Sequence, residues 1–265
     1  MDLSKIKMVV TDMDGTLLNS QHEVSNRFFE LFQALKEKNI LFVAASGRQY
    51  DSMVAKLEAI KDDIIFVAEN GALVKKKNHT LCSTPLEHQY IKQVLDLISP
   101  IPNAHPVLCG ANTAYVNGAS LAFIELLKEY YTAFSPVTDQ YAVHGEIMKI
   151  AVYHDESSER NIYPQVAHLE DKLKVKVSGA HWIDISHPDA HKGHALAKLM
   201  QTYGVGSHEL LVFGDYNNDL EMLELAQFSV AMENAHQNVK KTAKYHTTSN
   251  DDLGVERVLE KLLRS

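Results

Sequence analysis

The chain has 265 residues, of which 45% are hydrophobic, and it carries a formal net charge of −8. This apolar content supports a sizeable core and excludes general disorder, while the excess of acidic residues gives no electrostatic reason to bind nucleic acid or an anionic membrane. Two cysteines outside any C-x-x-C pair give no disulfide framework, and no segment approaches the ~20 apolar residues of a membrane span. We therefore expect a cytoplasmic, monomeric protein that binds neither nucleic acid nor a membrane.

The first 80 residues alternate between strand and helix patterns. Short apolar runs predict buried strands, and apolar residues at helical spacing predict helices, the first of them with Ser25 as its N-cap. The predicted strands are 6–10, 40–46 and 63–70, and the predicted helices are 25–38 and 51–60. Repeated strand–helix–strand units produce right-handed crossovers and a parallel sheet.

The pattern changes at 82–88, a proline-containing segment that we predict to be a linker. The strands predicted after it are shorter and alternate more clearly between apolar and polar residues. These strands are 113–117, 148–154, 174–179 and 181–186, with a helix at 121–131. Such a pattern is typical of an α+β domain with a largely antiparallel sheet, and a second linker follows at 186–190.

Beyond the second linker the first pattern resumes. Helices are predicted at 191–203, 217–226 and 255–263, and strands at 209–214 and 228–232. The simplest interpretation is an α/β fold: a Rossmann-like core with a parallel sheet, formed by 1–83 and 188–265, interrupted by an inserted α+β cap domain at 84–187. Both parts have ordinary domain sizes.

Polar residues collect where the predicted core strands end, which is where open parallel sheets bind ligands. The four strand ends carry Asp12 and Asp14; Ser46, Gly47 and Arg48; Glu69, Asn70 and Gly71; and Gly214 and Asp215, followed by Asn217, Asn218 and Asp219. Lys192 begins a helix beside the second linker. Converging carboxylates favour a hard cation with open water positions, Mg²⁺ rather than Ca²⁺. Ser46, a possible helix N-terminus after Gly47, and Lys192 would bind an anion beside it, which indicates phosphoryl chemistry.

Each feature taken alone has a simpler interpretation. An Asp-x-Asp-Gly segment is also found in ordinary turns. A Ser-Gly-Arg segment is also found in ordinary loops, and a lysine at a helix start is often simply exposed to solvent. The segment 215–219 resembles a calcium loop, but Leu220 and Ala226 stand where that loop requires Gly and Glu. Trp182, which shares a strand face with Asp184 and Ser186, fits a core position better than a substrate contact.

The ordered segments DMDGTLL, SGR, HKG and GDYNND resemble the motifs of the haloacid dehalogenase superfamily of hydrolases. The insertion after the third core strand and the segment AENGA resemble the Cof-like subfamily, which has a large α/β cap. The similarity covers nearly the whole chain and is weakest across the cap. Relatives often carry a small polar residue before the motif lysine, where this chain has His191.

The resemblance implies roles for individual residues. Asp12 is expected to attack phosphorus and Asp14 to act as the general acid and base. Mg²⁺ would be held by Asp12, Asp14 through its backbone carbonyl, and Asp215, with support from Asp219. The groups expected to bind the phosphoryl oxygens are Ser46, Gly47, Lys192 and Asn218.

The resulting expectation is a Mg²⁺-dependent phosphatase that acts on small phosphorylated metabolites, with sugar phosphates as the class that the resemblance implies. The cap would select the substrate. Two alternatives remain: a phosphomutase, and a non-catalytic regulator that binds metal and phosphate on the same fold. The presence of both Asp12 and Asp14 argues against the regulator, since mere binding needs no acid–base carboxylate.

Overall fold

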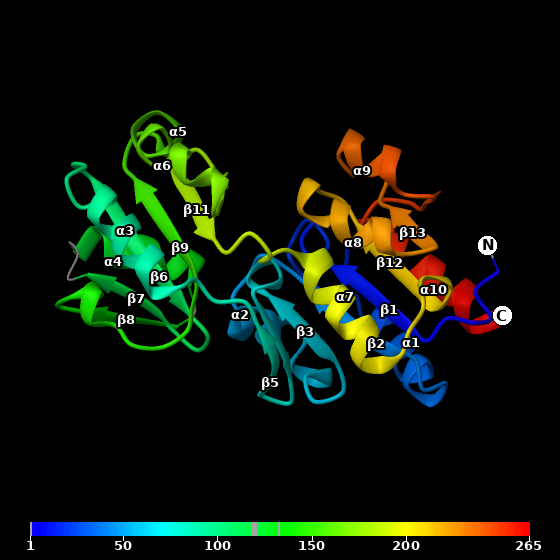
Figure 1. The fold of residues 1–265 in the computed structure, drawn as a ribbon. Coiled ribbons are helices and arrows are strands. Elements are labelled where there is room, and N and C mark those ends of the chain that lie inside the picture. The colour runs from blue at the N-terminus through cyan, green and yellow to red at the C-terminus, as the bar shows by residue number, and fades with distance from the viewer. Residues whose placement is uncertain (1, 118–120, 132) are drawn as a thin grey trace. The chain divides into compact units, whose positions relative to one another are not determined.

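The computed structural model describes residues 2–117, 121–131 and 133–265, and the chain forms two compact units (Figure 1). The first unit comprises the residues up to Arg48, Met53–Cys82 and His191–Ser265. The second comprises Gln49–Ser52 and Ser83–Ala190. Each unit has its own sheet and is described separately.

The first unit is built on an eight-stranded sheet of order β14-β13-β12-β1-β2-β3-β4-β5. Its strands are β1 (Met8–Asp12), β2 (Leu41–Ala45), β3 (Ile65–Ala68), β4 (Leu73–Lys76), β5 (His79–Ser83), β12 (Leu210–Gly214), β13 (Phe228–Ala231) and β14 (Tyr245–His246). Neighbours are parallel from β14 to β3, and β4 pairs antiparallel with β3. The predicted α/β fold with a parallel-sheet core is confirmed.

Helices cover both faces of this sheet, which is why every residue of β1 and β12 is buried. The helices are α1 (Asn26–Glu37), α7 (Lys192–Tyr203), α8 (Leu220–Leu225), α9 (Gln237–Thr242) and α10 (Gly254–Arg264). A further helix, α2 (Tyr50–Lys56), begins in the segment Gln49–Ser52 of the second unit and ends in the first. Figure 1 shows α7 and α8 in front of the sheet and α1 behind it. As predicted, the side chain of Ser25 caps α1 by accepting a hydrogen bond from the backbone N–H of Phe28.

The second unit contains a six-stranded sheet of order β10-β11-β9-β6-β7-β8. Its strands are β6 (Ala104–Gly110), β7 (Ala114–Asn117), β8 (Phe134–Val137), β9 (Ile147–His154), β10 (Lys174–Val177) and β11 (Trp182–Ser186). Four of the five neighbouring pairs are antiparallel and β7–β8 is parallel, in agreement with the predicted, largely antiparallel sheet. Its helices are α3 (His88–Ile98), α4 (Leu121–Tyr130), α5 (Ser158–Asn161) and α6 (Tyr163–Val166).

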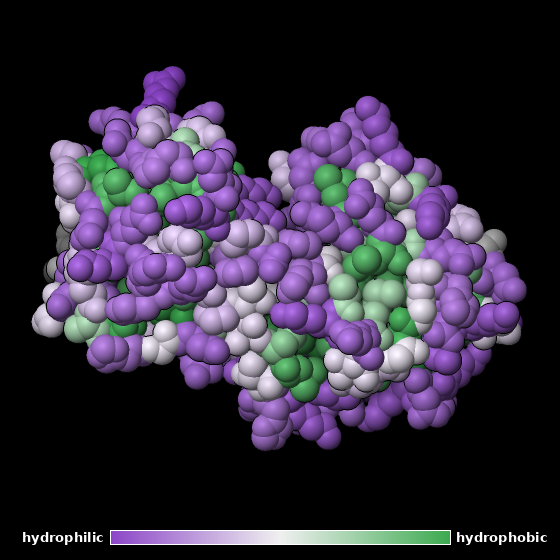
Figure 2. All heavy atoms as spheres, in the orientation of Figure 1, coloured by the Kyte–Doolittle hydropathy of each residue, from purple (hydrophilic) through white to green (hydrophobic). Residues whose placement is uncertain are grey.

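Alternation along the strands gives the second unit two hydrophobic clusters. Ile183 and Ile185 of β11 belong to the cluster that includes α3, whereas Trp182 packs against the cluster that includes α4. The Trp182 ring lies 5.1 Å from that of Tyr153 between centroids, which agrees with a core position. Figure 2 shows that the visible surface is mostly hydrophilic, with small apolar areas between polar ones.

Several elements were not expected from the sequence. They are β4, β5, α3, β6, β8, the short helices α5 and α6, α9 and the two-residue strand β14. Because β5 extends to Ser83, the linker predicted at 82–88 is shorter than expected. The helix predicted at 51–60 ends at Lys56 and is followed by a 3₁₀ turn, Glu58–Ile60.

Across the described part of the chain, no helix combines the length and the apolar character needed to cross a membrane.

Candidate active site

A buried lysine joins two of the predicted aspartates. Lys192 begins α7, and its Nζ donates to Asp12 at the end of β1 and to Oδ1 of Asp219 at 2.7 Å. All three residues are at most 5% exposed. The second oxygen of Asp219 accepts the backbone N–H groups of Asp215 and Tyr216 at 3.0 and 3.1 Å. Asp219 therefore fixes both the lysine and the loop after β12.

Asp215 completes an acidic cluster with Asp12 and Asp219. One carboxylate oxygen from each of these three residues lies within 4.8 Å of those of the other two. Thr16 Oγ1 donates to Oδ1 of Asp215 at 2.9 Å. Gly15 has a φ of +77°, and a Cβ at this position would lie 2.4 Å from Oδ2 of Asp215. A side chain here would clash with Asp215. A glycine is therefore needed for the ends of β1 and β12 to approach each other this closely.

The carboxylate of Asp14 lies against a different cation. Arg48 donates from Nε to Oδ2 of Asp14 at 2.7 Å and from a terminal nitrogen to Oδ1 at 2.6 Å. His22 Nδ1 lies 3.4 Å from the same carboxylate. Although burial alone would raise the pKa of Asp14, the hydrogen bonds and charge of Arg48 hold that pKa below its ordinary value. Asp12 and Asp14 thus have distinct surroundings despite their spacing.

The predicted phosphate-binding groups come together around the turn after β3. Ser46 is 1% exposed, and its Oγ accepts the backbone N–H of Arg48 at 3.1 Å. A Cβ on Gly47 would lie 3.1 Å from the side chain of Asn70. Asn218 donates from Nδ2 to Oδ1 of Asn70 at 3.0 Å. Segments from β2, β3 and the loop after β12 therefore meet at one place.

The charges of the acidic cluster fit a divalent cation. Burial raises the pKa of Asp12 well above its ordinary value, with opposition from the charge of Lys192 and reinforcement from Asp219 and Asp215. Burial and the charge of Asp219 raise the pKa of Asp215 to about 6. Burial alone would lower the pKa of Lys192, but Asp12 and Asp219 together raise it. One lysine does not balance three carboxylates, and an all-oxygen donor set suits Mg²⁺.

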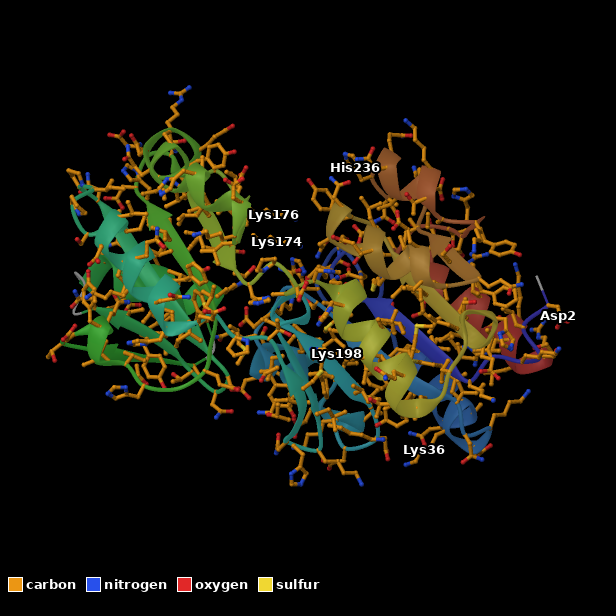
Figure 3. The ribbon with its side chains drawn as sticks, in the orientation of Figure 1. Asp2, Lys36, Lys174, Lys176, Lys198 and His236 are labelled. Atoms are coloured by element: carbon orange, nitrogen blue, oxygen red, sulfur yellow. The ribbon has the colours of Figure 1, made fainter. Side chains whose placement is uncertain are left out.

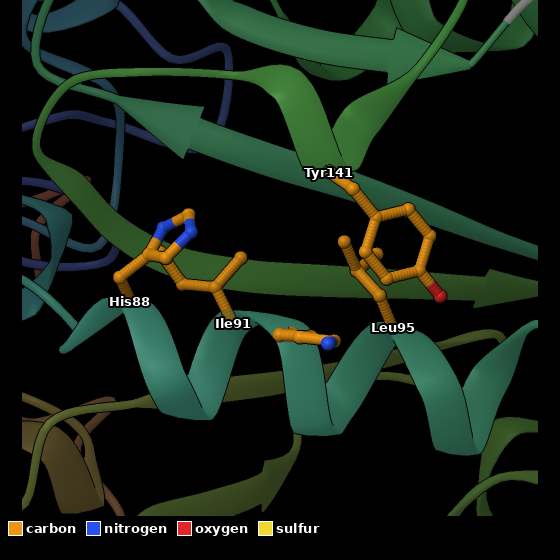
Figure 4. A pocket seen from close by; sticks show the side chains of 5 residues that line it. His88, Ile91, Leu95 and Tyr141 are labelled. Atoms are coloured by element: carbon orange, nitrogen blue, oxygen red, sulfur yellow. The ribbon is translucent and has the colours of Figure 1, made fainter.

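A separate hollow lies in the second unit. It has a volume of about 310 Å³ and is lined by His88, Ile91, Lys92, Leu95 and Tyr141 (Figure 4). Its walls are mainly α3 and the ring of Tyr141, whose Oη donates to Asp96 at 2.9 Å. None of the predicted site residues lines this hollow. The five lining residues include no carboxylate, whereas the acidic cluster offers three carboxylates and a lysine.

Four contacts of the site were not predicted. The sequence identified Arg48 only as part of a loop, and neither Thr16 nor Asn70 was assigned a partner. His191, noted as a departure from the usual motif, is the N-cap of α7, and its Nδ1 accepts the backbone N–H of His194 at 3.2 Å. The sequence does carry a signal for this contact: a helix predicted to begin here is preceded by a side chain that can accept a hydrogen bond, as an N-cap must.

Comparison with known proteins shows the family. The model of the haloacid dehalogenase-like hydrolases matches residues 9–259. The chain is 32% identical to 5-amino-6-(5-phospho-D-ribitylamino)uracil phosphatase YbjI of Escherichia coli, over 98% of this chain and 97% of that protein. It is 28% identical to 5-amino-6-(5-phospho-D-ribitylamino)uracil phosphatase YwtE of Bacillus subtilis, over 97% and 98% of the two chains.

A solved structure agrees with these relatives. SMU.1108c of Streptococcus mutans is 33% identical and superposes with a TM-score of 0.85, over 98% of this chain and 100% of its own. The family match, the phosphatase relatives and the shared fold extend over nearly the whole chain. The protein belongs to the haloacid dehalogenase-like hydrolases and is a phosphatase of that family.

Proposed function

We propose that this phosphatase hydrolyses small phosphorylated metabolites with Mg²⁺ through an aspartyl-phosphate intermediate on Asp12. The observation that carries the proposal is the buried Lys192 between Asp12 and Asp219, with Asp215 in the same cluster. The positive charge of the lysine opposes the effect of burial on the pKa of Asp12 and so favours the ionised form, which a nucleophile requires. It also places a positive charge where a phosphoryl group would meet that nucleophile.

The reaction proceeds in two displacements. An oxygen of Asp12 forms a bond to phosphorus while the bond from phosphorus to the leaving oxygen breaks, and Asp14 gives that oxygen a proton. Asp14 then takes a proton from water, whose oxygen attacks the aspartyl phosphate. Inorganic phosphate leaves, Asp12 is regenerated, and the proton on Asp14 is available for the next cycle.

Arg48 has a part in the second displacement. Its two hydrogen bonds keep Asp14 as an anion, and this is the form that can accept a proton from water. For the first displacement Asp14 must hold a proton, so Arg48 has to give up at least one of these bonds. The negative charge of an arriving substrate offers Arg48 another partner.

The residues that would hold the metal are Asp12, the backbone carbonyl of Asp14, and Asp215, with Asp219 supporting the loop. When bound, Mg²⁺ supplies positive charge that offsets the charge of the phosphoryl oxygens. Ser46, the N–H of Gly47, Lys192 and Asn218 are the groups that we assign to those oxygens.

For the substrate we propose a phosphate monoester of a sugar or of a sugar-like polyol. The resemblance to the Cof-like subfamily suggests sugar phosphates, and two relatives are named for a substrate that contains a phosphorylated ribityl chain. Selection among such esters is assigned to the inserted segment 84–187. A panel of sugar and sugar-alcohol phosphates assayed for phosphate release would rank them.

The two-aspartate scheme is tested with Asp14→Asn and an aryl phosphate. The aryl leaving group needs little protonation, so the variant is expected to release one aryl alcohol per enzyme molecule and then nearly stop. Loss of the base slows hydrolysis of the intermediate by about 10²–10⁴-fold. Mass spectrometry of acid-quenched protein should locate one added phosphoryl group in the peptide that contains Asp12.

The matched control is Asp12→Asn, which should give neither product nor phosphoprotein. Phosphorylation at another residue, or unchanged turnover of sugar phosphates by Asp14→Asn, would contradict the scheme. Product analysis separates the alternatives: a phosphomutase returns an isomeric phosphate ester, and a regulator without catalysis returns the substrate.

A further inference from the structure

We propose that Asn70 is a positioning residue, held in a left-handed turn, that orients Asn218 toward the phosphoryl group. The inference rests on the proposed function, because that function assigns Asn218 to phosphate. Asn70 stands outside the residues assigned above, and the geometry of its turn points to this role.

The turn has an unusual backbone. Glu69, Asn70 and Gly71 follow β3 with φ values of 50°, 54° and 101°. Asparagine and glycine tolerate the left-handed region, but glutamate does so at a cost in free energy. Glu69 is also 3% exposed, so the surroundings over-determine its conformation. Backbone strain of this kind concentrates at functional sites.

The turn is hydrogen-bonded to the segment that follows β2. The backbone N–H of Glu69 donates to the carbonyl of Arg48 at 3.0 Å, and that of Asn70 donates to the carbonyl of Ser46 at 3.0 Å. The side chain of Asn70 also fills the space beside Gly47, where a Cβ would come within 3.1 Å. Ser46 and Arg48 are therefore hydrogen-bonded to this turn, and Gly47 between them lies against the side chain of Asn70.

The same turn touches the segment that carries the lysine. Gly71 approaches so closely that a Cβ would lie 2.4 Å from the carbonyl oxygen of His191 and 2.9 Å from the backbone nitrogen of Lys192. Glycine is required here both by this approach and by its φ of 101°. The start of α7 is thus seated against the turn.

Asn70 makes a further connection with its side chain. Its Oδ1 accepts a hydrogen from Nδ2 of Asn218 at 3.0 Å, across 148 residues of sequence. An amide nitrogen carries two hydrogens in one plane. The bond to Asn70 uses one and fixes that plane, so the direction of the second hydrogen is set. Asn70 acts on the anion through Asn218 and does not need to touch it.

Asn70→Gly separates the side chain from the backbone, because glycine adopts the left-handed conformation without strain. The probes are inorganic phosphate, as ligand and competitive inhibitor, and an aryl phosphate, as substrate, with Mg²⁺ present. We expect the Kd for phosphate and the KM to rise by about tenfold, a usual effect for one hydrogen bond to a charged group. The kcat and the melting temperature should change little.

The matched control is Asn39→Gly. Asn39 has a φ of 57° and lies between α1 and β2, where its backbone N–H donates to the carbonyl of Lys36 at 3.0 Å. It should leave Kd, KM and kcat unchanged. A rise in Kd with Asn39→Gly equal to that with Asn70→Gly would mean that the effect comes from backbone flexibility and would overturn the proposal.

A double-variant cycle tests whether Asn70 acts through Asn218. If it does, Asn218→Ala and Asn70→Gly/Asn218→Ala weaken phosphate binding equally. Additive effects, or phosphate binding by Asn70→Gly as tight as in the parent, would overturn the inference while the phosphatase remains. A parent enzyme that fails to bind phosphate would contradict the proposed phosphate site itself.

Discussion

Lys192 carries its charge in a place where its side chain is closed to water. The residue is 1% exposed, and its ammonium group contacts Asp12 and Asp219. A buried ion pair of this kind is expensive to dismantle, because removal of one partner leaves a buried charge without compensation. The lysine therefore contributes to the stability of the site, and the proposed mechanism also places its charge against the phosphoryl group.

Lys192→Ala should raise the activation barrier by about 2–4 kcal/mol, the range found when a group that stabilises transition-state charge is removed. This corresponds to a loss in kcat/KM of about 30- to 800-fold. The measurement is phosphate release from an aryl phosphate, with Mg²⁺ present.

Lys198→Ala is the control, since Lys198 lies further along α7, beyond its first residue Lys192 (Figure 3). It should retain the parent activity. If Lys192→Ala, shown to be folded by its melting transition, lost less than tenfold, the role assigned to Lys192 would be wrong.

Asp215 makes the stability of the metal-free protein depend on pH. Its pKa is about 6 in the folded chain, above the ordinary value of 3.8. A carboxyl whose pKa is raised by folding favours the folded state at low pH, and this contribution is lost as the pH rises from about 4 to about 6. Bound Mg²⁺ should restore this stabilisation of the folded state above pH 6, where protons no longer compete with the metal for the Asp215 carboxylate.

The expected result is a larger rise in melting temperature on addition of Mg²⁺ at pH 7.5 than at pH 5, with chelator-treated protein as the reference. Asp215→Asn should remove most of the difference between the two pH values. Equal rises at both pH values would exclude this carboxyl as the group that couples metal binding to protons.

At this scale the sequence predicted the identity of the groups better than their partners. Asp12, Asp215 and Lys192 stand at strand and helix ends, and the order of those ends in a parallel sheet is enough to bring them together. The bond from Arg48 to Asp14 depends on side-chain rotamers, and the bond from Asn218 to Asn70 depends on a left-handed turn. Neither is encoded in hydrophobic periodicity.

Helix α7 links the site to the packing of the first unit through the glycines near its two ends. A Cβ on Gly193 would lie 2.6 Å from Cβ of Glu221 in α8, so α7 and α8 are in direct backbone contact there. Gly204 ends the helix with a φ of 63° and has open space around it. The first glycine is required by packing and the second by conformation.

Gly193→Ala should lower the free energy of unfolding by about 1–3 kcal/mol through overpacking and should reduce kcat, because the shift displaces the adjacent Lys192. Gly204→Ala should cost about 1 kcal/mol through left-handed strain and leave kcat unchanged. Denaturant unfolding and steady-state kinetics measure both. Equal kcat values for the two variants would show that the α7–α8 contact does not position the lysine.

Elements with strong patterns were predicted and elements at the margins were not. The central strands β1, β2, β3 and β12 are continuous apolar runs, typical of strands buried on both faces. By contrast, β5 has a mostly exposed pattern at the edge of the sheet, and β14 has only two residues. Such strands form because a neighbour is already in place, and their own sequences carry little signal.

The whole molecule consists of two units with separate hydrophobic interiors, and the second is formed almost entirely by Ser83–Ala190. Its sheet and helices pack on one another to form their own clusters. A unit of this size can fold by itself. Removal of this segment should therefore leave the eight-stranded sheet of the first unit intact.

Joining Cys82 to His191 through a short glycine-rich linker should give a protein that still hydrolyses an aryl phosphate weakly. It should lose most discrimination among sugar phosphates, because selection is assigned to the deleted segment. Circular dichroism and melting establish that the shortened protein is folded before the comparison. An unchanged ranking of substrates would move the selectivity to the first unit.

Asp12 and its partner Lys192 lie 180 residues apart along the chain, and Thr16 and Asp215 lie 199 apart. A ribosome therefore makes Asp12, the nucleophile of the proposed mechanism, early and Lys192 late. At roughly 5–20 residues per second, roughly 10 to 40 s pass between the two. During that interval β1 also lacks β12, its neighbour in the finished sheet, because β12 has not yet been synthesised. The cluster of Asp12, Lys192 and Asp215 can therefore assemble only in the last part of translation, and under the proposed mechanism the chain has no activity before then.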